Sequence, residues 1–132
     1  LLILFIGLFI VVAGIEKTSL SSGAIAFASG YGLDRPAVLS AFAAVLSNLV
    51  SNVPAVLVFK PFIPRLADPK QAWLVLAMAS TLAGNLTVLG SVANLIVVQR
   101  ARRQVEISFW DYFKIGAPLT AATIVIGVLL LR

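Results

Sequence analysis

The stretch V-L-S-N-L-V-S-N-V-P-A-V-L-V, residues 45–58, places polar residues and a proline inside a long apolar segment. The segment that contains it, residues 36–59, has no charged side chain, yet the pairs Ser47-Asn48 and Ser51-Asn52 and then Pro54 stand near its centre. In hydrocarbon every backbone N–H and C=O needs a partner within the protein, and a proline removes one donor from a helix. Because such residues are tolerated where a membrane helix is interrupted and faces a cavity, the stretch predicts a helix break beside a binding site.

The composition is that of an integral membrane protein. Of 132 residues, 61% are hydrophobic and 11% are charged, and the mean hydropathy is +1.07. The net charge of +5 does not indicate a nucleic-acid partner, because Arg100, Arg102 and Arg103 lie together beside an apolar run. This arrangement is typical of a cytoplasmic loop whose arginines set topology and contact lipid headgroups. The chain has no cysteine or histidine, which excludes disulfides, thiolate chemistry and histidine relays within it.

Apolar runs and polar interruptions divide the chain into five segments. Because the sequence begins inside an apolar run without methionine, we expect a piece of a longer protein. The aromatic residues Trp110, Tyr112 and Phe113 predict a membrane-interface belt. The five segments are a truncated span at 1–15, an interfacial segment at 18–33, the interrupted segment 36–59 with its tip at 51–54, a second interrupted segment 72–98 with its break at 84–91, and a last span at 115–131.

Two geometries are open for residues 36–59. As one helix the segment would reach roughly 36 Å, enough for a full span. Alternatively, Ser51-Asn52-Val53-Pro54 would be the tip of a re-entrant hairpin whose arms reach only the middle of the bilayer. Counting basic residues on the two sides gives six against four in either topology, so the positive-inside rule does not decide between them.

Two motifs resemble a known superfamily of ion transporters. Ser51-Asn52-Val53-Pro54 is similar to its hairpin tip, and residues 84–94, G-N-L-T-V-L-G-S-V-A-N, look like its helix break. The superfamily includes citrate-transporter-like permeases, divalent anion:sodium symporters and arsenite permeases, and the whole chain resembles its C-terminal half. The resemblance implies an all-α integral membrane fold, with three transmembrane spans plus a re-entrant helical hairpin and one span broken at mid-membrane. It also implies one inverted repeat of an elevator-type transporter, an N-terminal repeat in the same protein, a homodimer and a multi-pass location in the cell membrane.

The hairpin tip and the helix break supply the predicted binding residues for substrate and ion. A competing interpretation is that the polar residues only join helices by hydrogen bonds. Within the predicted site, we expect sodium ligands among Ser51, Asn52, Asn85 and Thr87, and backbone contacts from Val53, Gly84 and Gly90. The full predicted site is Ser51, Asn52, Val53, Pro54, Gly84, Asn85, Thr87, Gly90 and Ser91.

The sequence predicts secondary active transport of a small inorganic or organic anion, coupled to sodium. Proton coupling usually needs a carboxylate or histidine inside the membrane, and the acidic residues here lie at the ends of the apolar runs. Dicarboxylate symporters carry threonine where this tip has Val53, so the pattern is closer to arsenite and inorganic-anion permeases. A sodium/proton antiporter, an arsenite-type efflux permease and a structural membrane subunit are the alternatives. We expect no enzymatic activity, no catalytic residue and no cofactor other than sodium as the coupling ion.

Overall fold

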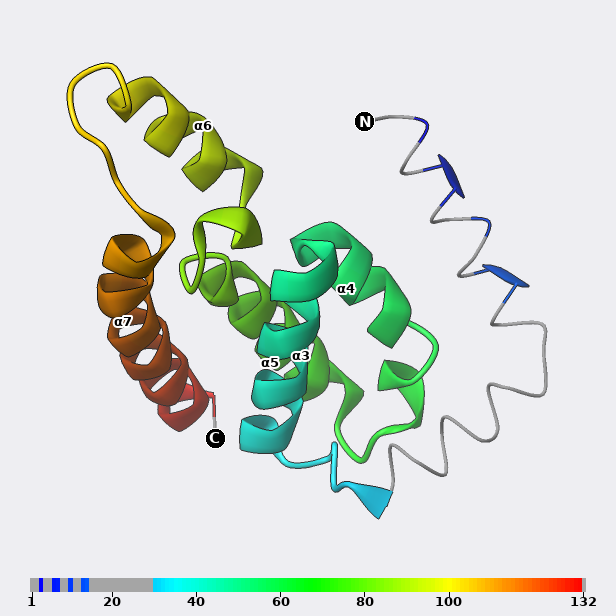
Figure 1. Ribbon diagram of the computed structural model, residues 1–132. Helices are drawn as coiled ribbons and strands as arrows, with labels where there is room; N and C mark the ends of the chain where they lie inside the picture. Colours follow the sequence, from blue (N-terminus) through cyan, green and yellow to red (C-terminus); the bar gives the residue numbers. More distant parts are fainter. Residues whose placement is uncertain (1–2, 4–5, 8–9, 11–12, 15–29, 132) are drawn as a thin grey trace.

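The computed structural model describes residues 3, 6–7, 10, 13–14 and 30–131, and the elements within 30–131 are helical, with no strand. Within residues 30–131, five α-helices and two short 3₁₀ turns follow one another (Figure 1). They are α3 at Pro36–Val50, α4 at Asn52–Phe59, η1 at Ile63–Arg65, α5 at Pro69–Ala83, η2 at Val88–Gly90, α6 at Val92–Ala101 and α7 at Phe109–Leu130.

The segment 36–59 folds as two helices and not as one. Pro36 opens α3, where its fixed φ suits a first helical turn. Pro54 disfavours helical continuation from four residues before it, and α3 accordingly ends at Val50. Ser51 separates α3 from α4 with a φ of 75°, a left-handed conformation that is uncommon for a residue with a side chain. The continuous 24-residue helix of the full-span alternative therefore does not form.

The segment 72–98 is interrupted between α5 and α6. Asp68 caps α5 by accepting a hydrogen bond from the Gln71 backbone N–H at 3.0 Å. After Ala83 the chain tightens into i→i+3 hydrogen bonds, runs extended at Thr87 and Ser91, and resumes as α6 at Val92. The predicted break at 84–91 coincides with the interval between these two helices.

Helix α7 is the one helix in the described part of the chain that is long and apolar enough to cross a membrane. It begins at Phe109, before the predicted start of the last span at residue 115, because Ser108 and Asp111 form a capping box. Pro118 lies inside the helix without ending it. Large apolar side chains remain exposed along α7, as expected for a lipid-facing surface: Ile115, Leu119, Val125, Ile126, Leu129 and Leu130.

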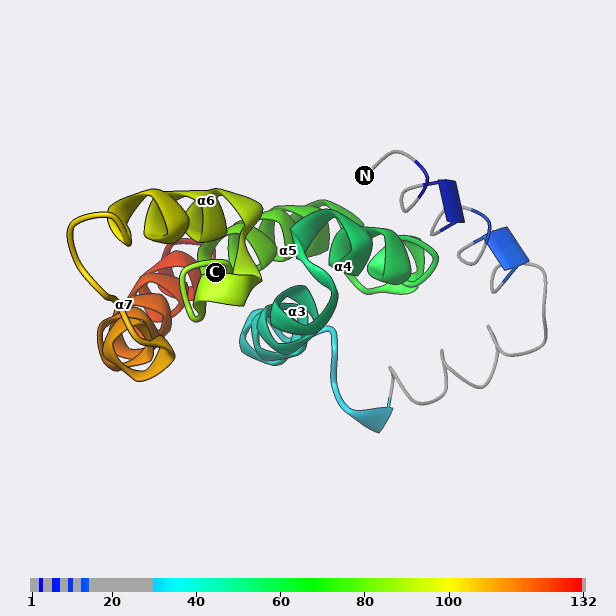
Figure 2. The same cartoon turned by 45° about the horizontal axis from the view of Figure 1, so that its top comes forward.

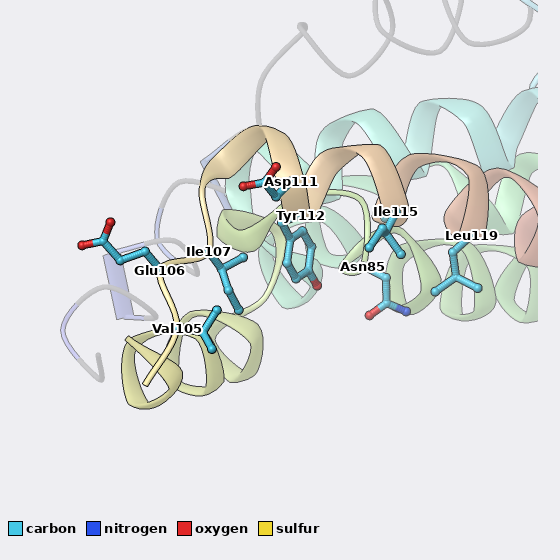
Figure 3. Close-up of a pocket in the computed structure, with 9 residues that line it drawn as sticks. Asn85, Val105, Glu106, Ile107, Asp111, Tyr112, Ile115 and Leu119 are labelled. Atoms are coloured by element: carbon cyan, nitrogen blue, oxygen red, sulfur yellow. The ribbon is translucent and has the colours of Figure 1, made fainter. Parts of the chain in front are cut away.

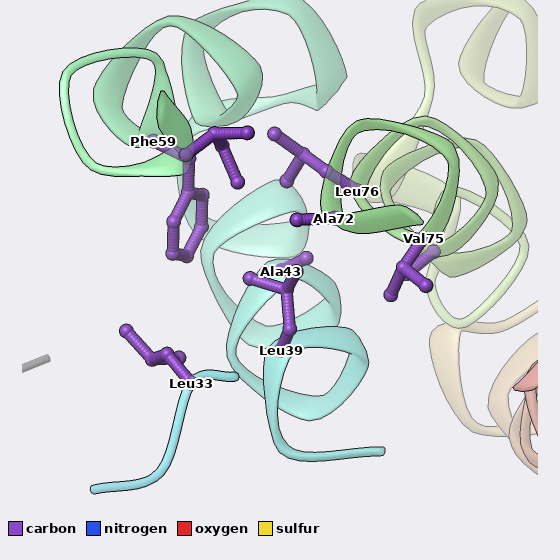
Figure 4. Packing of buried hydrophobic residues seen from close by; sticks show 9 residues of the cluster. Leu33, Leu39, Ala43, Phe59, Ala72, Val75 and Leu76 are labelled. Carbon is purple, nitrogen blue, oxygen red and sulfur yellow. The ribbon is translucent and has the colours of Figure 1, made fainter. Parts of the chain in front are cut away.

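Helix α5 is the centre of the packing, since it contacts α3, α4 and α7 (Figure 2). The apolar core lies where α5 meets α3 and the segment between α4 and η1 (Figure 4). Leu76, Val75 and Ala79 of α5 are fully buried there. On its other side α5 packs against the small-residue face of α7, where Gly127 fits against Met78. This arrangement places the end of α5 between the hairpin and α7.

The first predicted span, 1–15, and most of the predicted interfacial segment, 18–33, lie outside the described residues. The helical fold class is confirmed for the part of the chain that the structure describes. The number of spans, the re-entrant position of the hairpin and the inverted-repeat architecture stay predictions.

Candidate functional site

The tip of the hairpin consists of Ser51 and the first turn of α4. Only Ser51 is non-helical, and Asn52, Val53 and Pro54 already belong to α4. The backbone N–H groups of Asn52 and Val53 have no acceptor in the described part of the chain, because no side chain caps this helix. Such a helix start carries partial positive charge. The side chain of Val53 is exposed, whereas Pro54 is buried.

Ser47 joins the hairpin to α5 from a fully buried position on α3. Its hydroxyl donates to the Ser80 carbonyl at 2.8 Å, and the same Oγ lies 2.6 Å from Asn52 Oδ1. A hydroxyl has one proton, so both contacts are satisfied together when the Asn52 amide is turned and its Nδ2 donates to Ser47. Asn52 is therefore held in place by the protein itself.

Asn48 joins α3 to the helix break. Its Nδ2 donates to the Ala83 carbonyl at 2.8 Å and to the Ala44 carbonyl at 3.0 Å. Its Oδ1 accepts from the hydroxyl of Thr87 at 3.1 Å. Both amide hydrogens are thus used, and the carbonyl that α5 exposes at its last residue gains a partner.

The break is built from close backbone packing and two further side-chain bonds. Thr87 accepts a hydrogen bond from the Gly90 N–H at 3.0 Å, and Asn94 donates to the Gly84 carbonyl at 2.8 Å. Gly90 lies against the hairpin, since a Cβ there would stand 2.6 Å from Asn48 Oδ1 and 3.0 Å from the Gly84 carbonyl oxygen. Glycine at position 90 is therefore required by this close approach.

Asn85 lies apart from the hairpin tip, in a pocket of about 520 Å³ between the break and the start of α7 (Figure 3). The labelled side chains of Tyr112, Ile115 and Leu119 surround it, and that of Glu106 extends away. The tip residues Asn52 and Val53 line a different groove, of about 260 Å³, between α4 and α5. The pockets of Asn85 and of the tip are thus separate within this chain.

Hydrogen bonding divides the predicted site residues into two groups. Thr87 and Asn52 are engaged within the protein, and Gly84 and Gly90 serve the packing of the break. The side chains of Ser51, Asn85 and Ser91 form no hydrogen bond in the described part of the chain, although each is half-buried. These three side chains are available to a ligand. Ser51, Asn52, Val53 and Pro54 are brought together at the tip, and Gly84, Asn85, Thr87, Gly90 and Ser91 at the break.

Sequence reasoning left Ser47 and Asn48 out of the site and counted Asn94 only as a weaker candidate, although each of the three ties one of the two interruptions in place. Ser47 and Asn48 lie in the quoted stretch, four residues before Ser51 and Asn52. This repetition of the Ser-Asn pair four residues earlier was the available signal, because it places polar side chains in the last turn before the predicted tip.

Comparison with known proteins identifies the family. The family model described as citrate transporter matches residues 1–132. The chain is 38% identical to the putative transporter arsB of Dictyostelium discoideum, covering 97% of this chain and 24% of that protein. It is 37% identical to the silicon efflux transporter LSI3 of Oryza sativa subsp. japonica, covering 97% of this chain and 29% of that protein.

An uncharacterized transporter of Mycobacterium tuberculosis, MT2759, is 30% identical over 98% of this chain and 33% of its own length. No solved structure matches. The chain thus spans about a quarter to a third of the length of these relatives. The resemblance drawn from the two motifs is confirmed, and the chain belongs to the citrate transporter family of membrane transporters.

Proposed function

We propose that this chain is one part of a secondary active transporter, a multi-pass protein of the cell membrane that moves a small inorganic or organic anion together with sodium. Its site is formed by the hairpin tip and the helix break, and is completed by an N-terminal repeat of the same protein within a homodimer. Membership of the citrate transporter family supports transport, and its transporter relatives support the absence of enzymatic activity.

One observation carries the proposal beyond the family. Neutral side chains of α3 fasten the hairpin to the helix break and to α5: Asn48 bonds to Thr87 of the break, and Ser47 bonds to Ser80 of α5. A structural anchor has no need for two interrupted helices, since each interruption leaves backbone groups that must find partners in a low-dielectric surrounding. Broken helices that meet near one another are the usual source of ion sites in transporters.

The chemistry of the free groups suits a sodium ion and an anion. Ser51, Asn85 and Ser91 offer uncommitted oxygens, the ligand type that hard cations prefer. The free N–H groups of Asn52 and Val53 at the start of α4 suit an anion. The carboxylates within 30–131 lie in loops or the first turn of α7: Asp34, Asp68, Glu106 and Asp111. This placement supports sodium over proton coupling.

An arsenite-type efflux permease is the second candidate. Two observations favour it: Val53 occupies the third position of the tip, and one relative is named a silicon efflux transporter. A sodium/proton antiporter is a further alternative, in which the proton carrier would lie outside residues 30–131. The direction of transport and the identity of the coupling ion distinguish these candidates in a reconstituted system.

The test uses the full-length parent in proteoliposomes. We would measure uptake of radiolabelled citrate, phosphate and arsenate with and without an inward sodium gradient. The variants are Asn85→Ala, which removes an uncommitted amide, and Asn48→Ala, which removes an amide that holds the break. We expect Asn85→Ala to weaken sodium activation while its unfolding temperature stays that of the wild type. We expect Asn48→Ala to lower the unfolding temperature.

Sodium-independent uptake by the wild type would contradict sodium coupling. Arsenite efflux from loaded vesicles without anion uptake would instead support the efflux permease. Unchanged sodium activation in correctly folded Asn85→Ala and Ser51→Ala proteins, which each lack one uncommitted side-chain oxygen, would remove the break and the tip from the binding site and would leave them a structural role only.

A further inference from the structure

The arginine cluster at the end of α6, Arg100, Arg102 and Arg103, divides into two faces. Ile96, Gln99, Arg100 and Arg103 line one pocket of about 560 Å³. Their spacing of three, four and seven residues is that of one helical face. Helix α6 ends at Ala101, but the N–H groups of Arg102 and Val105 bond back to the Val98 and Ala101 carbonyls, which keeps the following turn in helical register. The side chains of Arg100 and Arg103 therefore lie on the same side of the helix.

Arg102 belongs to the opposite face. It lines a different pocket, together with Ser108 and the carboxylate residues Glu106 and Asp111. The face of Arg100 and Arg103 includes no acidic residue. Within residues 30–131, the guanidinium groups of Arg100 and Arg103 form no ion pair and no hydrogen bond, and both side chains are exposed. Two uncompensated guanidinium groups one turn apart create a local site for an anion with several oxygens.

The surroundings of this pair are those of a membrane interface. The cluster is separated from the membrane-length helix α7 only by residues 104–108. The first two turns of α7 carry Phe109, Trp110 and Phe113 in mutual contact, with ring centroids 5.6 to 6.1 Å apart. Exposed aromatic residues of this kind lie at headgroup level. One turn before Arg100, on the same helical face, the exposed side chain of Ile96 offers an apolar surface to a lipid acyl chain.

We propose that Arg100 and Arg103 form a binding site for the phosphate of an anionic phospholipid, whose acyl chain lies along Ile96. Arg102 is not part of this site. The occupant is a lipid and not a free phosphate, because the pocket combines two phosphate-binding guanidinium groups with an exposed apolar side chain next to a membrane-length helix. A role in membrane topology would be shared by all three arginines, whereas this proposal assigns lipid binding to Arg100 and Arg103 and not to Arg102.

Substitution of arginine by lysine separates phosphate recognition from charge. Lysine preserves the positive charge, and with it the topology signal, but lacks the planar fork that binds phosphate through two parallel hydrogen bonds. The variants are Arg100→Lys/Arg103→Lys, with Arg102→Lys as the matched control and the two single variants as a safeguard against misfolding. The full-length protein in detergent is titrated with phosphatidylglycerol, phosphatidylcholine or inorganic phosphate, and its unfolding temperature is measured.

We expect phosphatidylglycerol to stabilise the wild type and Arg102→Lys alike, and its apparent affinity to fall roughly tenfold in the double variant. Each single variant is expected to lose part of this affinity. An unchanged affinity in the double variant, or an equal loss in Arg102→Lys, would overturn the site. Equal stabilisation by phosphatidylcholine would overturn the anionic specificity, and equal stabilisation by inorganic phosphate would overturn the assignment to a lipid.

Discussion

Replacing Gly90 by alanine tests whether the helix break is held by close packing against the hairpin. The added Cβ would stand 2.6 Å from Asn48 Oδ1 and 3.0 Å from the Gly84 carbonyl oxygen, well inside ordinary contact distance. Asn48 has little freedom to move, because its amide is bonded to Ala83 and Thr87 as well as within α3. The collision must therefore shift the break away from α3 or release Asn48 from its partners.

The expected loss of unfolding free energy combines two destabilising terms with one smaller offset. Overpacking of a well-filled site costs about 1–3 kcal/mol. Each hydrogen bond of Asn48 that is lost with the movement contributes about 1 kcal/mol more. Alanine also restricts the unfolded chain, which offsets about 0.4–1 kcal/mol where the native backbone accepts it. We expect Gly90→Ala to lower the free energy of unfolding of the full-length protein by about 2–4 kcal/mol.

A double-mutant cycle measured by denaturant unfolding in detergent connects this cost to Asn48. In an Asn48→Ala background the nearest colliding atom is absent, so the added cost of Gly90→Ala should fall to less than half. Gly84→Ala is the matched control, because its Cβ would stand 3.2 Å from its nearest neighbour, the Thr81 carbonyl oxygen, and should be tolerated better. Costs of Gly90→Ala and Asn48→Ala that simply add would refute the reasoning.

Three further predictions concern the packing and capping of α7 and the hydrogen bond of Ser47, and they use the same unfolding assay. Gly116→Ala should destabilise more than Gly127→Ala, because the first Cβ meets the rigid carbonyl of Asn85 and the second meets only a flexible methionine side chain; equal effects would contradict this packing. Ser108→Ala should cost about 1 kcal/mol through loss of the α7 capping box, and Ser108→Thr should preserve it. Ser47→Ala should cost about 1–2 kcal/mol by leaving a buried carbonyl of α5 without its side-chain partner, and an unchanged unfolding midpoint would argue against the bond at 2.8 Å.

The positions where the helices stop could be predicted from the sequence, because they depend on local chemistry. Pro54 and the Ser-Asn pair before it mark the end of α3, which the structure places at Val50. The glycines at 84 and 90 mark the interval between α5 and α6. Proline and glycine act on the backbone within one turn of their own position, so their effects are readable without knowledge of the tertiary contacts.

The division of the polar residues into structural and available groups could not be predicted in this way. The partner of Ser47 lies 33 residues away, and that of Asn48 lies 35 residues away. Asn48 and Asn85 look alike in sequence, yet one is fully bonded and the other lies in a pocket beside α7. Which asparagine side chain donates to a backbone carbonyl depends on how α3 packs on α5, and local secondary-structure propensity does not determine this packing.

Because asparagine side chains hold the two helix interruptions in place, the effect of a substitution in this site on transport must be interpreted together with its effect on stability. An interrupted helix exposes backbone carbonyls, which cost free energy in hydrocarbon unless they accept a hydrogen bond. Some of the polar side chains must therefore bond to these carbonyls and are not available to a ligand. Here Asn48 bonds to the last carbonyl of α5 and Asn94 to the carbonyl of its cap Gly84, while the side chains of Ser51 and Asn85 have no hydrogen-bond partner within residues 30–131. Loss of transport alone does not distinguish these roles. A structural amide lowers stability with or without sodium, whereas a ligand changes chiefly the stabilisation that sodium itself provides.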